Sequence, residues 1–268
     1  MSGELTVCVL GFGDQTTDLG RCLESIRRVL PGDESVARVR IGLNRPSSAL
    51  SVLPARWAAS CADARPMLPC NIVRTTWLPK YPTARLLIHG DADADADVTP
   101  IETEYVMWFD DDSYICDDAP ATFFADHVAA MAQGGYDLAG SRYTQTLRRG
   151  QRAWIEAQPW ANLAVFPSPQ KNAAGDDMAT FCQGAWWIAR TARLREWDYP
   201  WPQLYHNGGD VMLGELARRQ HWKIRNTRDG VAINAGATGR ESKAPRRGLD
   251  TDPIGMEGAP DGRDIAQG

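Results

Sequence analysis

Long apolar runs are absent from the 268-residue chain, and its first residues lack the charged-then-apolar pattern of a secretory signal. The six cysteines show no paired spacing of the kind that marks a metal site, and several lie in apolar stretches, as reduced core thiols do. No internal repeat is evident. These absences argue against a membrane-spanning chain and a disulfide scaffold. We therefore expect a cytoplasmic protein without disulfides and without a transmembrane segment.

Charge is unevenly distributed along the chain, although the net charge is only −5. Residues 1–140 carry 11 basic and 20 acidic side chains, whereas residues 141–247 carry 17 basic and 9 acidic ones. A basic second half indicates an anionic ligand or partner there. The alternative is a solvated surface with ordinary arginine content.

Apolar patterns in the first half alternate between strands and helices. Buried strands are predicted over four ranges: 6–11, 36–43, 71–76 and 105–109. Helices are predicted over residues 17–30 and 82–88. This alternation favours an α/β protein with a mostly parallel central sheet and helices on both faces.

The second half is richer in aromatic residues and contains seven of the ten tryptophans. A helix is predicted near Pro120 and another over residues 210–220. Strands are predicted over three further ranges: 181–189, 221–225 and 231–234. From residue 241 onward glycine, proline and charge dominate, which predicts a loosely ordered tail over 241–268.

Three aspartates, Asp110, Asp111 and Asp112, follow directly on the apolar strand at 105–109. In open α/β sheets, ligands bind at the carboxyl ends of the strands. Crowded carboxylates repel one another unless a cation or proton neutralises them, and their oxygens suit Mg²⁺ or Mn²⁺ bridging to phosphates. The pattern predicts a metal–diphosphate site. The alternative is a helix-capping turn, although Asp117 and Asp118 already supply a cap before the next helix.

Other stretches carry residues suited to the same chemistry. Lys80 and Arg85 precede the aspartates and can bind phosphate oxygens, or they are ordinary surface residues. Gly184 lies in a strand beside Trp186 and Trp187, where a ligand can approach the backbone and a sugar can stack on an aromatic face. The alternative is a core strand with aromatic packing.

Asp210 follows a double glycine at the start of a predicted helix, in the segment that begins at His206. One interpretation of Asp210 is a helix N-cap, the commoner role for aspartate at such a position. The other is a general base, which needs a pocket and a raised pKa to act near neutral pH.

In their order and spacing these motifs resemble the GT-A glycosyltransferases, in particular the inverting family 2, over residues 5–235. The segment 107–113 resembles the family's Asp-x-Asp element. Ala84-Arg85 resembles its Ala-Arg-Asn segment, and residues 183–186 resemble its acceptor-side glycine strand. Residues 209–214 resemble its Glu-Asp-x-x-Leu helix start, with Gly209 in the place of the usual glutamate. Residues 221–224 resemble its Gly-Trp-Lys strand.

The resemblance implies a single GT-A (Rossmann-like) domain over 1–240, with a nucleotide-sugar-binding half (1–115) and an acceptor half (116–240). It implies transfer of a sugar from a nucleotide-diphosphate sugar, by default a UDP-sugar, to an acceptor hydroxyl with inversion. Asp210 is then the catalytic base, and Asp112 with Asp110 holds Mn²⁺ or Mg²⁺. The implied donor-binding residues are Gly11, Asn44, Lys80, Arg85, Asp110 and Asp111. The implied acceptor-binding residues are Gly184, Trp186, Trp187 and His206.

Two other functions fit parts of the sequence. A nucleotidyltransferase also uses paired acidic residues at a strand end to hold a metal and a triphosphate. Such an enzyme ordinarily has a basic glycine-rich loop after the first strand, whereas here the acidic Asp14 follows Gly13, which disfavours this function. A non-catalytic sugar- or nucleotide-binding protein would keep the same fold without turnover. The acceptor stays open: a saccharide, a small metabolite, a protein side chain, or a polyanion such as DNA with a hydroxymethylated base flipped into the pocket.

Overall fold

The computed structural model describes residues 4–65, 68–76, 79–90, 98–146, 170–202, 204, 209–227 and 229–233. In the first half, strands alternate with helices: β1 (Leu5–Phe12), α1 (Thr16–Val29), a 3₁₀ turn η1 (Leu30–Gly32), β2 (Val36–Asn44), α2 (Ser48–Ala64), β3 (Cys70–Thr75), α3 (Lys80–His89) and β4 (Tyr105–Asp110). The second half adds β5 (Tyr114–Ile115), α4 (Phe123–Gly134), β6 (Leu138–Thr146), β7 (Gln170–Lys171), β8 (Asp177–Arg190), α6 (Thr191–Glu196), α7 (Gly209–Arg219), β9 (Ile224–Asn226) and β10 (Val231–Ala232).

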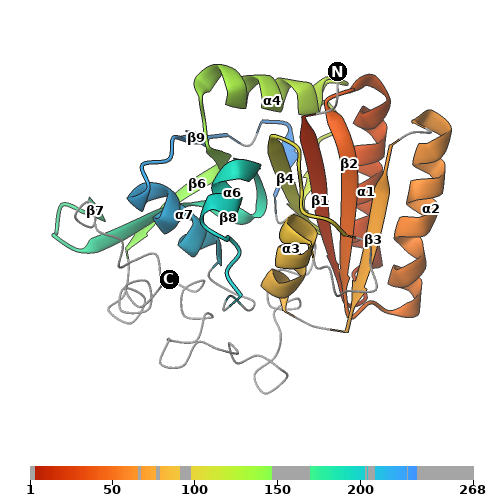
Figure 1. Ribbon diagram of the computed structural model, residues 1–268, viewed down its shortest axis with the longest axis horizontal. Coiled ribbons are helices and arrows are strands. Elements are labelled where there is room, and N and C mark those ends of the chain that lie inside the picture. Colours follow the sequence, from red (N-terminus) through yellow and green to blue (C-terminus); the bar gives the residue numbers. More distant parts are fainter. Residues whose placement is uncertain are drawn as a thin grey trace.

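One continuous sheet runs through both halves of the chain in the order β3-β2-β1-β4-β8-β6-β9, with β7 paired to β8 (Figure 1). Pairing is parallel from β3 to β4 and between β6 and β9, and antiparallel where β8 meets β4 and β6. A small second sheet joins β5 to β10. The predicted α/β class is confirmed, and the sheet is mixed because β8 runs against its neighbours.

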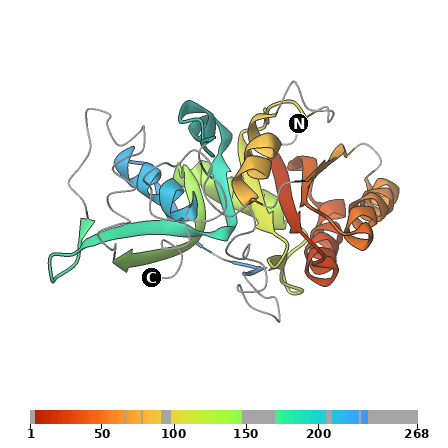
Figure 2. The same cartoon turned by 90° about the horizontal axis from the view of Figure 1, so that it is seen from below.

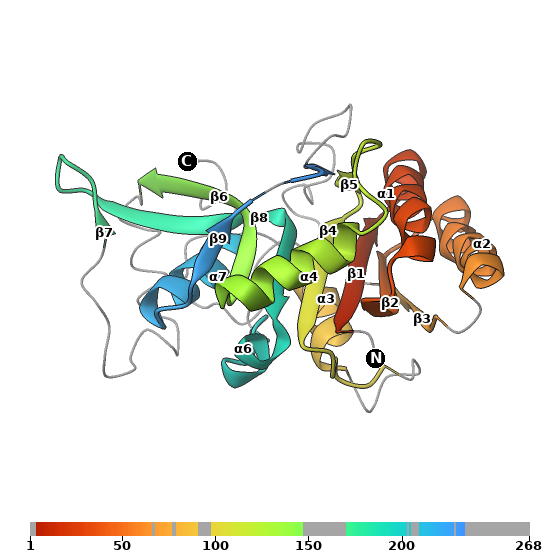
Figure 3. The same ribbon diagram turned by 90° about the horizontal axis from the view of Figure 1, so that it is seen from above.

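Helices cover both faces of the sheet (Figure 2). The core on one face contains buried side chains from α1, α2 and α4, and the core on the other face contains those from α3, α6 and α7. Alternation along β1 explains this division, because Val7 and Val9 belong to one core and Cys8 and Leu10 to the other. Figure 3 shows α4 lying across the middle of the sheet.

The last residues of the parallel strands share one edge of the sheet. Phe12 of β1 pairs with Asn44 of β2, which pairs with Thr75 of β3, and Leu10 pairs with Asp110 at the end of β4. From β1 the chain winds outward to β2 and β3, and β4 then returns on the other side of β1. Such a reversal opens a ligand crevice between the strands beside it, and here these are β1 and β4.

The predicted boundary between the halves at residue 115 stays a prediction, and the tail from residue 241 lies outside the described residues. In the described part of the chain, no helix has the length and apolar character needed to cross a membrane. All six cysteines are free thiols.

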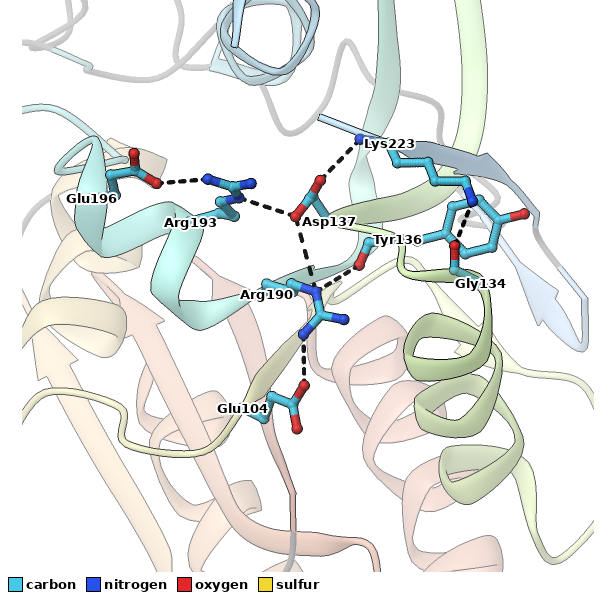
Figure 4. Close-up of polar contacts among 8 residues, drawn as sticks. All are labelled: Glu104, Gly134, Tyr136, Asp137, Arg190, Arg193, Glu196 and Lys223. Carbon is cyan, nitrogen blue, oxygen red and sulfur yellow. Dashed lines mark hydrogen bonds and ion pairs between the residues drawn. The ribbon is translucent and has the colours of Figure 1, made fainter. Parts of the chain in front are cut away.

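A network of charges at the opposite end of the sheet joins elements from both halves (Figure 4). Asp137, at the start of β6, is buried and accepts hydrogen bonds from Arg193 Nε and from the Lys223 backbone N–H, both at 3.0 Å. Arg190 Nε lies 3.9 Å from the same carboxylate, and its Nη1 pairs with Glu104 at 2.6 Å. The network therefore ties together the segment before β4, the start of β6, the end of β8 and α6.

Replacing Asp137 by alanine is expected to lower the free energy of unfolding by about 1–3 kcal/mol, because the Lys223 N–H loses its acceptor and the guanidinium groups of Arg190 and Arg193 each lose one of their partners. Urea denaturation measures the change. Glu196→Ala is the matched control, because its ion pair with Arg193 joins two half-exposed side chains, and it should cost no more than about 0.5 kcal/mol. Equal losses in the two variants would contradict a network centred on Asp137.

Candidate active site

Asp110 ends β4 with both carboxylate oxygens hydrogen-bonded. Its Oδ1 accepts from Trp108 Nε1 at 2.8 Å, and its Oδ2 accepts from Lys80 Nζ at 2.8 Å. The same ammonium donates to the carbonyl oxygen of Gly184 in β8, also at 2.8 Å. Lys80 thus links the carboxyl end of β4 to β8 and holds a positive charge at the edge where the aspartates lie.

A pair of stacked tryptophans lies next to the Lys80 ammonium. Trp108 and Trp187 face each other across β4 and β8, with ring centroids 5.8 Å apart and planes inclined by 6°. Lys80 Nζ lies 5.7 Å from the Trp108 ring centroid, within the range of a cation–π contact. The ammonium is therefore fixed by two oxygens and a ring, and its position depends on three separate elements.

The other two aspartates of the triplet differ in burial. Asp111 is buried and accepts a hydrogen bond from the backbone N–H of Phe12 at 3.1 Å, which joins the ends of β1 and β4. Asp112 is partly exposed at the same edge. Among the described residues, no group of three or more His, Cys, Asp or Glu side chains is arranged to hold a metal ion. A cation at Asp112 would need further oxygen ligands from a bound diphosphate, as Mg²⁺ sites commonly do.

Asp210, the predicted base, packs against Gly184. Gly184 in turn binds Lys80, so Asp210 lies close to the pair formed by Lys80 and Asp110. A Cβ atom at Gly184 would lie 3.1 Å from Asp210 Cβ and 3.4 Å from its Oδ2, so any side chain there would crowd the carboxylate. The Gly184 carbonyl is also the acceptor for Lys80. Asp110, Lys80, Gly184 and Asp210 therefore form one contiguous cluster, drawn from β4, α3, β8 and α7.

Two buried tyrosines surround the backbone of Asp210, and the sequence did not suggest them. The Tyr81 ring fills the space beside Gly209, where an added Cβ would lie only 2.1 Å from Tyr81 Cζ. Tyr199 donates its hydroxyl to the Gly209 carbonyl at 2.8 Å. The Asp210 backbone is hydrogen-bonded to the Tyr81 hydroxyl, which is in turn hydrogen-bonded to Tyr199. Gly209 is thus explained by the tyrosine that packs against it.

Both tyrosines stay protonated at neutral pH. Burial raises the pKa of Tyr81 and of Tyr199 well above the usual 10, and the negative charge of Asp210 raises both further. Neutral hydroxyls can donate and accept at once, so the pair can anchor the Asp210 backbone through a fixed chain of hydrogen bonds.

Two of the predicted donor-binding residues, Gly11 and Asn44, are buried or packed in the core and hold neighbouring elements in place. Gly11 is packed in the core, where a Cβ would lie 2.8 Å from Leu19 Cδ2. Asn44 is fully buried, and its Nδ2 donates to the Pro79 carbonyl at 2.7 Å, directly before Lys80. Asn44 thus holds the start of α3 in place, and its contact with a donor stays a prediction.

Arg85 also lies in a different setting from the one expected. Its guanidinium forms an ion pair with Asp198 at 2.8 Å and donates to the Pro200 carbonyl at 2.8 Å. These contacts fasten α3 to the segment that follows α6. The described contacts of Arg85 are therefore structural ones.

The predicted stacking of an acceptor sugar on the twin tryptophans does not fit the structure. Consecutive residues of a strand point to opposite faces, so Trp186 and Trp187 enter different cores. Trp186 is fully buried, with His127 at 5.3 Å and Phe109 at 6.5 Å between ring centroids. Trp187 is 5% exposed and stacks on Trp108. Neither ring has a face open to an acceptor, whereas Gly184 remains at the site. His206 lies outside the described residues.

Comparisons with known proteins bear on the fold. No protein-family model and no curated protein sequence matches the chain. Among solved structures, the chain is similar to the mannosyltransferase PcManGT from Pyrobaculum calidifontis, solved in complex with GDP-Man and Mn²⁺. The TM-score is 0.50 at 16% identity, over 93% of this chain and 59% of that one. A match to S. aureus TarS has a TM-score of 0.47 at 12% identity, over 84% of this chain and 35% of that one.

The chain thus spans less than two thirds of the length of either structure. At 16% identity the likeness to the mannosyltransferase establishes the fold. The predicted α/β fold is confirmed, and it is similar to the fold of that mannosyltransferase. What this chain binds and transfers is a separate question, and it rests on the cluster around Asp110 and Asp210.

Proposed function

We propose that this protein is a glycosyltransferase that moves a sugar from a nucleotide-diphosphate sugar to an acceptor hydroxyl, with Asp210 as the general base. The observation that carries the proposal is the link through Lys80. One ammonium is bound at 2.8 Å both to Asp110, at the end of β4, and to the carbonyl oxygen of Gly184, the residue against which Asp210 packs. A positive charge for a diphosphate and a carboxylate for an acceptor proton thus both adjoin Gly184.

Donor binding is assigned to the edge between β1 and β4. Lys80 offers its ammonium to the diphosphate oxygens, and Asp110 keeps that ammonium in place. Asp112, with Asp110, would hold Mg²⁺ or Mn²⁺, which when bound would stabilise the negative charge of the departing diphosphate. Hard carboxylate oxygens and a ligand set completed by phosphate fit these ions.

Asp210 is assigned to the acceptor side. Its carboxylate takes the proton of the acceptor hydroxyl while that oxygen forms a bond to the anomeric carbon. The bond from the anomeric carbon to the diphosphate oxygen breaks on the opposite face, and the nucleoside diphosphate leaves. Attack from the face opposite to the leaving group inverts the anomeric configuration.

The proposal is tested by measuring release of nucleoside diphosphate from a panel of nucleotide sugars in the presence of Mn²⁺. UDP-sugars are the default donors from the motif resemblance. GDP-mannose joins the panel because the mannosyltransferase of similar fold was solved with it. We expect one donor to be turned over, with inversion in the product. Nucleotide binding without any release would instead favour a non-catalytic binding protein, and release of pyrophosphate from a nucleoside triphosphate would favour a nucleotidyltransferase.

Several classes of acceptor carry a hydroxyl group that Asp210 could deprotonate. A saccharide, a metabolite hydroxyl or a polyanion such as DNA with a hydroxymethylated base would each present a hydroxyl to Asp210. The excess of basic over acidic residues in 141–247 supports an anionic acceptor over a neutral one.

Tyr81→Phe is expected to lower kcat about tenfold with little change in the KM for the donor. The variant keeps the ring that packs on Gly209 and removes only the hydroxyl bonded to the Asp210 backbone, so the carboxylate loses part of its positioning. Steady-state kinetics measures the two constants separately. Tyr136→Phe, at the opposite end of the sheet, is the control. A change confined to KM would contradict a positioning role for Tyr81.

A further inference from the structure

A cavity with a volume of 490 Å³ opens at the edge of the sheet, where α7 ends and the chain turns toward β9. It lies beside the part of β6 and β8 that extends as a ribbon beyond the other strands (Figure 2). Asp210 is in the first turn of α7 and Arg218 comes eight residues later, so the cavity lies about 12 Å along the helix from the proposed base. Its principal lining residues are Arg142, Thr144, Thr180, Arg218, His221 and Trp222.

The charge of this cavity is positive. Glu215 is the carboxylate that α7 supplies nearby, and it binds two guanidinium groups, Arg218 through Nε at 2.9 Å and Arg219 through Nε at 2.7 Å. Arg142 adds an exposed guanidinium from β6, and the described residues that line the cavity include no acidic side chain. An anion entering the cavity would meet fixed positive charge from two sides.

Neutral donors line the same space. Thr144 Oγ1 and Thr180 Oγ1 lie 3.1 Å apart across β6 and β8, so two hydroxyls are presented together. Trp222, which is 5% exposed, also lines the cavity. Hydroxyl groups beside arginines suit a ligand that carries hydroxyl oxygens as well as charge.

The volume of the cavity favours a small-molecule ligand over a nucleic-acid strand. A volume of 490 Å³ falls within the about 300–1,000 Å³ typical of small-molecule sites. Proteins that follow a nucleic-acid strand use a continuous basic groove with several stacking aromatics. Arginine forks match phosphate oxygens in two-point contacts, and the threonine pair is placed to bond a sugar hydroxyl.

We propose that this cavity binds the phosphate group of a phosphorylated saccharide, at a site separate from the donor diphosphate. The assignment of that saccharide as the acceptor rests on the proposed function, with its phosphate held at the end of α7 and its reacting end toward Asp210. Binding itself depends only on the cavity.

The test is a calorimetric titration of the full chain with glucose 6-phosphate, inorganic phosphate and glucose. We expect glucose 6-phosphate to bind more tightly than inorganic phosphate, and glucose not to bind. Arg142→Gln should weaken glucose 6-phosphate binding about tenfold or more, because one charge-assisted contact is lost. Arg56→Gln is the control with the same change of charge, since Arg56 is exposed on α2. Equal thermal unfolding temperatures in the three proteins would establish that the variants fold.

Several outcomes would overturn the proposal. Absence of glucose 6-phosphate binding would do so, and so would an Arg142→Gln variant that binds it as tightly as the wild type does. Inorganic phosphate that binds as tightly as glucose 6-phosphate would remove the saccharide from the proposal. Salt-sensitive binding of a single-stranded oligodeoxynucleotide, without binding of glucose 6-phosphate, would replace it with a nucleic-acid site. If no nucleoside diphosphate binds while Arg142→Gln still weakens glucose 6-phosphate binding, the cavity assignment stands and the proposed function fails.

Discussion

Replacing Asp210 by asparagine is expected to lower kcat by a factor of about 10²–10⁴ while the affinity for the donor stays unchanged. Asparagine has the shape of aspartate and should keep the close packing against Gly184, but it cannot take a proton from the acceptor. Donor contacts are assigned to the other side of the cluster, at Lys80 and Asp112. Single-turnover kinetics with the donor identified by the panel, together with donor titration, measures both quantities.

This substitution also separates the two roles available to Asp210. Its Oδ1 accepts a hydrogen bond from the Val211 backbone N–H at 2.9 Å, so the carboxylate also has a bond within the first turn of α7. Asparagine serves nearly as well as aspartate in capping a helix. A purely structural Asp210 therefore predicts almost no change in the asparagine variant. Asp176→Asn, on the exposed turn between β7 and β8, is the control for the loss of one negative charge. Wild-type turnover in Asp210→Asn would refute the base assignment.

Replacing Asp112 by asparagine is expected to weaken metal-dependent binding of the nucleoside diphosphate by at least about 10–100-fold. An amide is a poorer ligand than a carboxylate for a hard divalent ion, and it carries no charge to balance that ion. Because Asp112 is partly exposed, its replacement should leave the unfolding temperature unchanged. Calorimetric titration with Mn²⁺ present, compared with titration in a chelator, isolates the metal-dependent part.

A matched control lies a few residues further along the chain. Asp117 is fully exposed, and its ion pair with Arg28 is long at 3.8 Å. Asp117→Asn removes the same charge at a residue that faces the last turn of α1, and it should leave nucleotide binding intact. Equal losses in the two variants would mean that general negative charge matters rather than a ligand at Asp112. Full metal-dependent binding in Asp112→Asn would remove Asp112 from the proposed metal site.

The sequence predicted the elements that carry continuous apolar patterns. The four parallel strands and the helix that begins near Asp210 were found to within a few residues, because buried strands and one-sided helices leave clear periodicities. Helix α2 was missed: it is alanine-rich, contains Pro54, and shows only weak segregation of apolar residues. Strand β6 was missed because residues such as Arg142 and Thr144 interrupt its apolar pattern. Helix α6 has six residues, too few to show a period.

The site was predicted in part for a similar reason. Clusters that are contiguous in sequence, such as the aspartate triplet, can be recognised from the sequence alone. Tyr199 and Asp210 are not adjacent in the sequence and come close only in the folded protein. The glycine at 209 was a usable signal, because a glycine in place of an expected acidic residue indicates that another group fills the space. The two adjacent tryptophans suggested a stacking surface for a sugar. Alternation along a strand, however, places adjacent side chains on opposite faces of the sheet, so the two rings cannot form one surface.

The central claim is that the edge between β1 and β4 binds a nucleoside diphosphate together with a divalent ion, next to Asp210. The most direct test is calorimetric titration of the chain with a panel of nucleoside diphosphates, first with Mn²⁺ and then with a chelator. The account predicts that one nucleotide binds with Mn²⁺, that binding weakens in the chelator and in Asp112→Asn, and that it persists in Asp210→Asn. Absence of binding by every nucleotide under both conditions would contradict the account and leave the aspartate triplet as a structural turn.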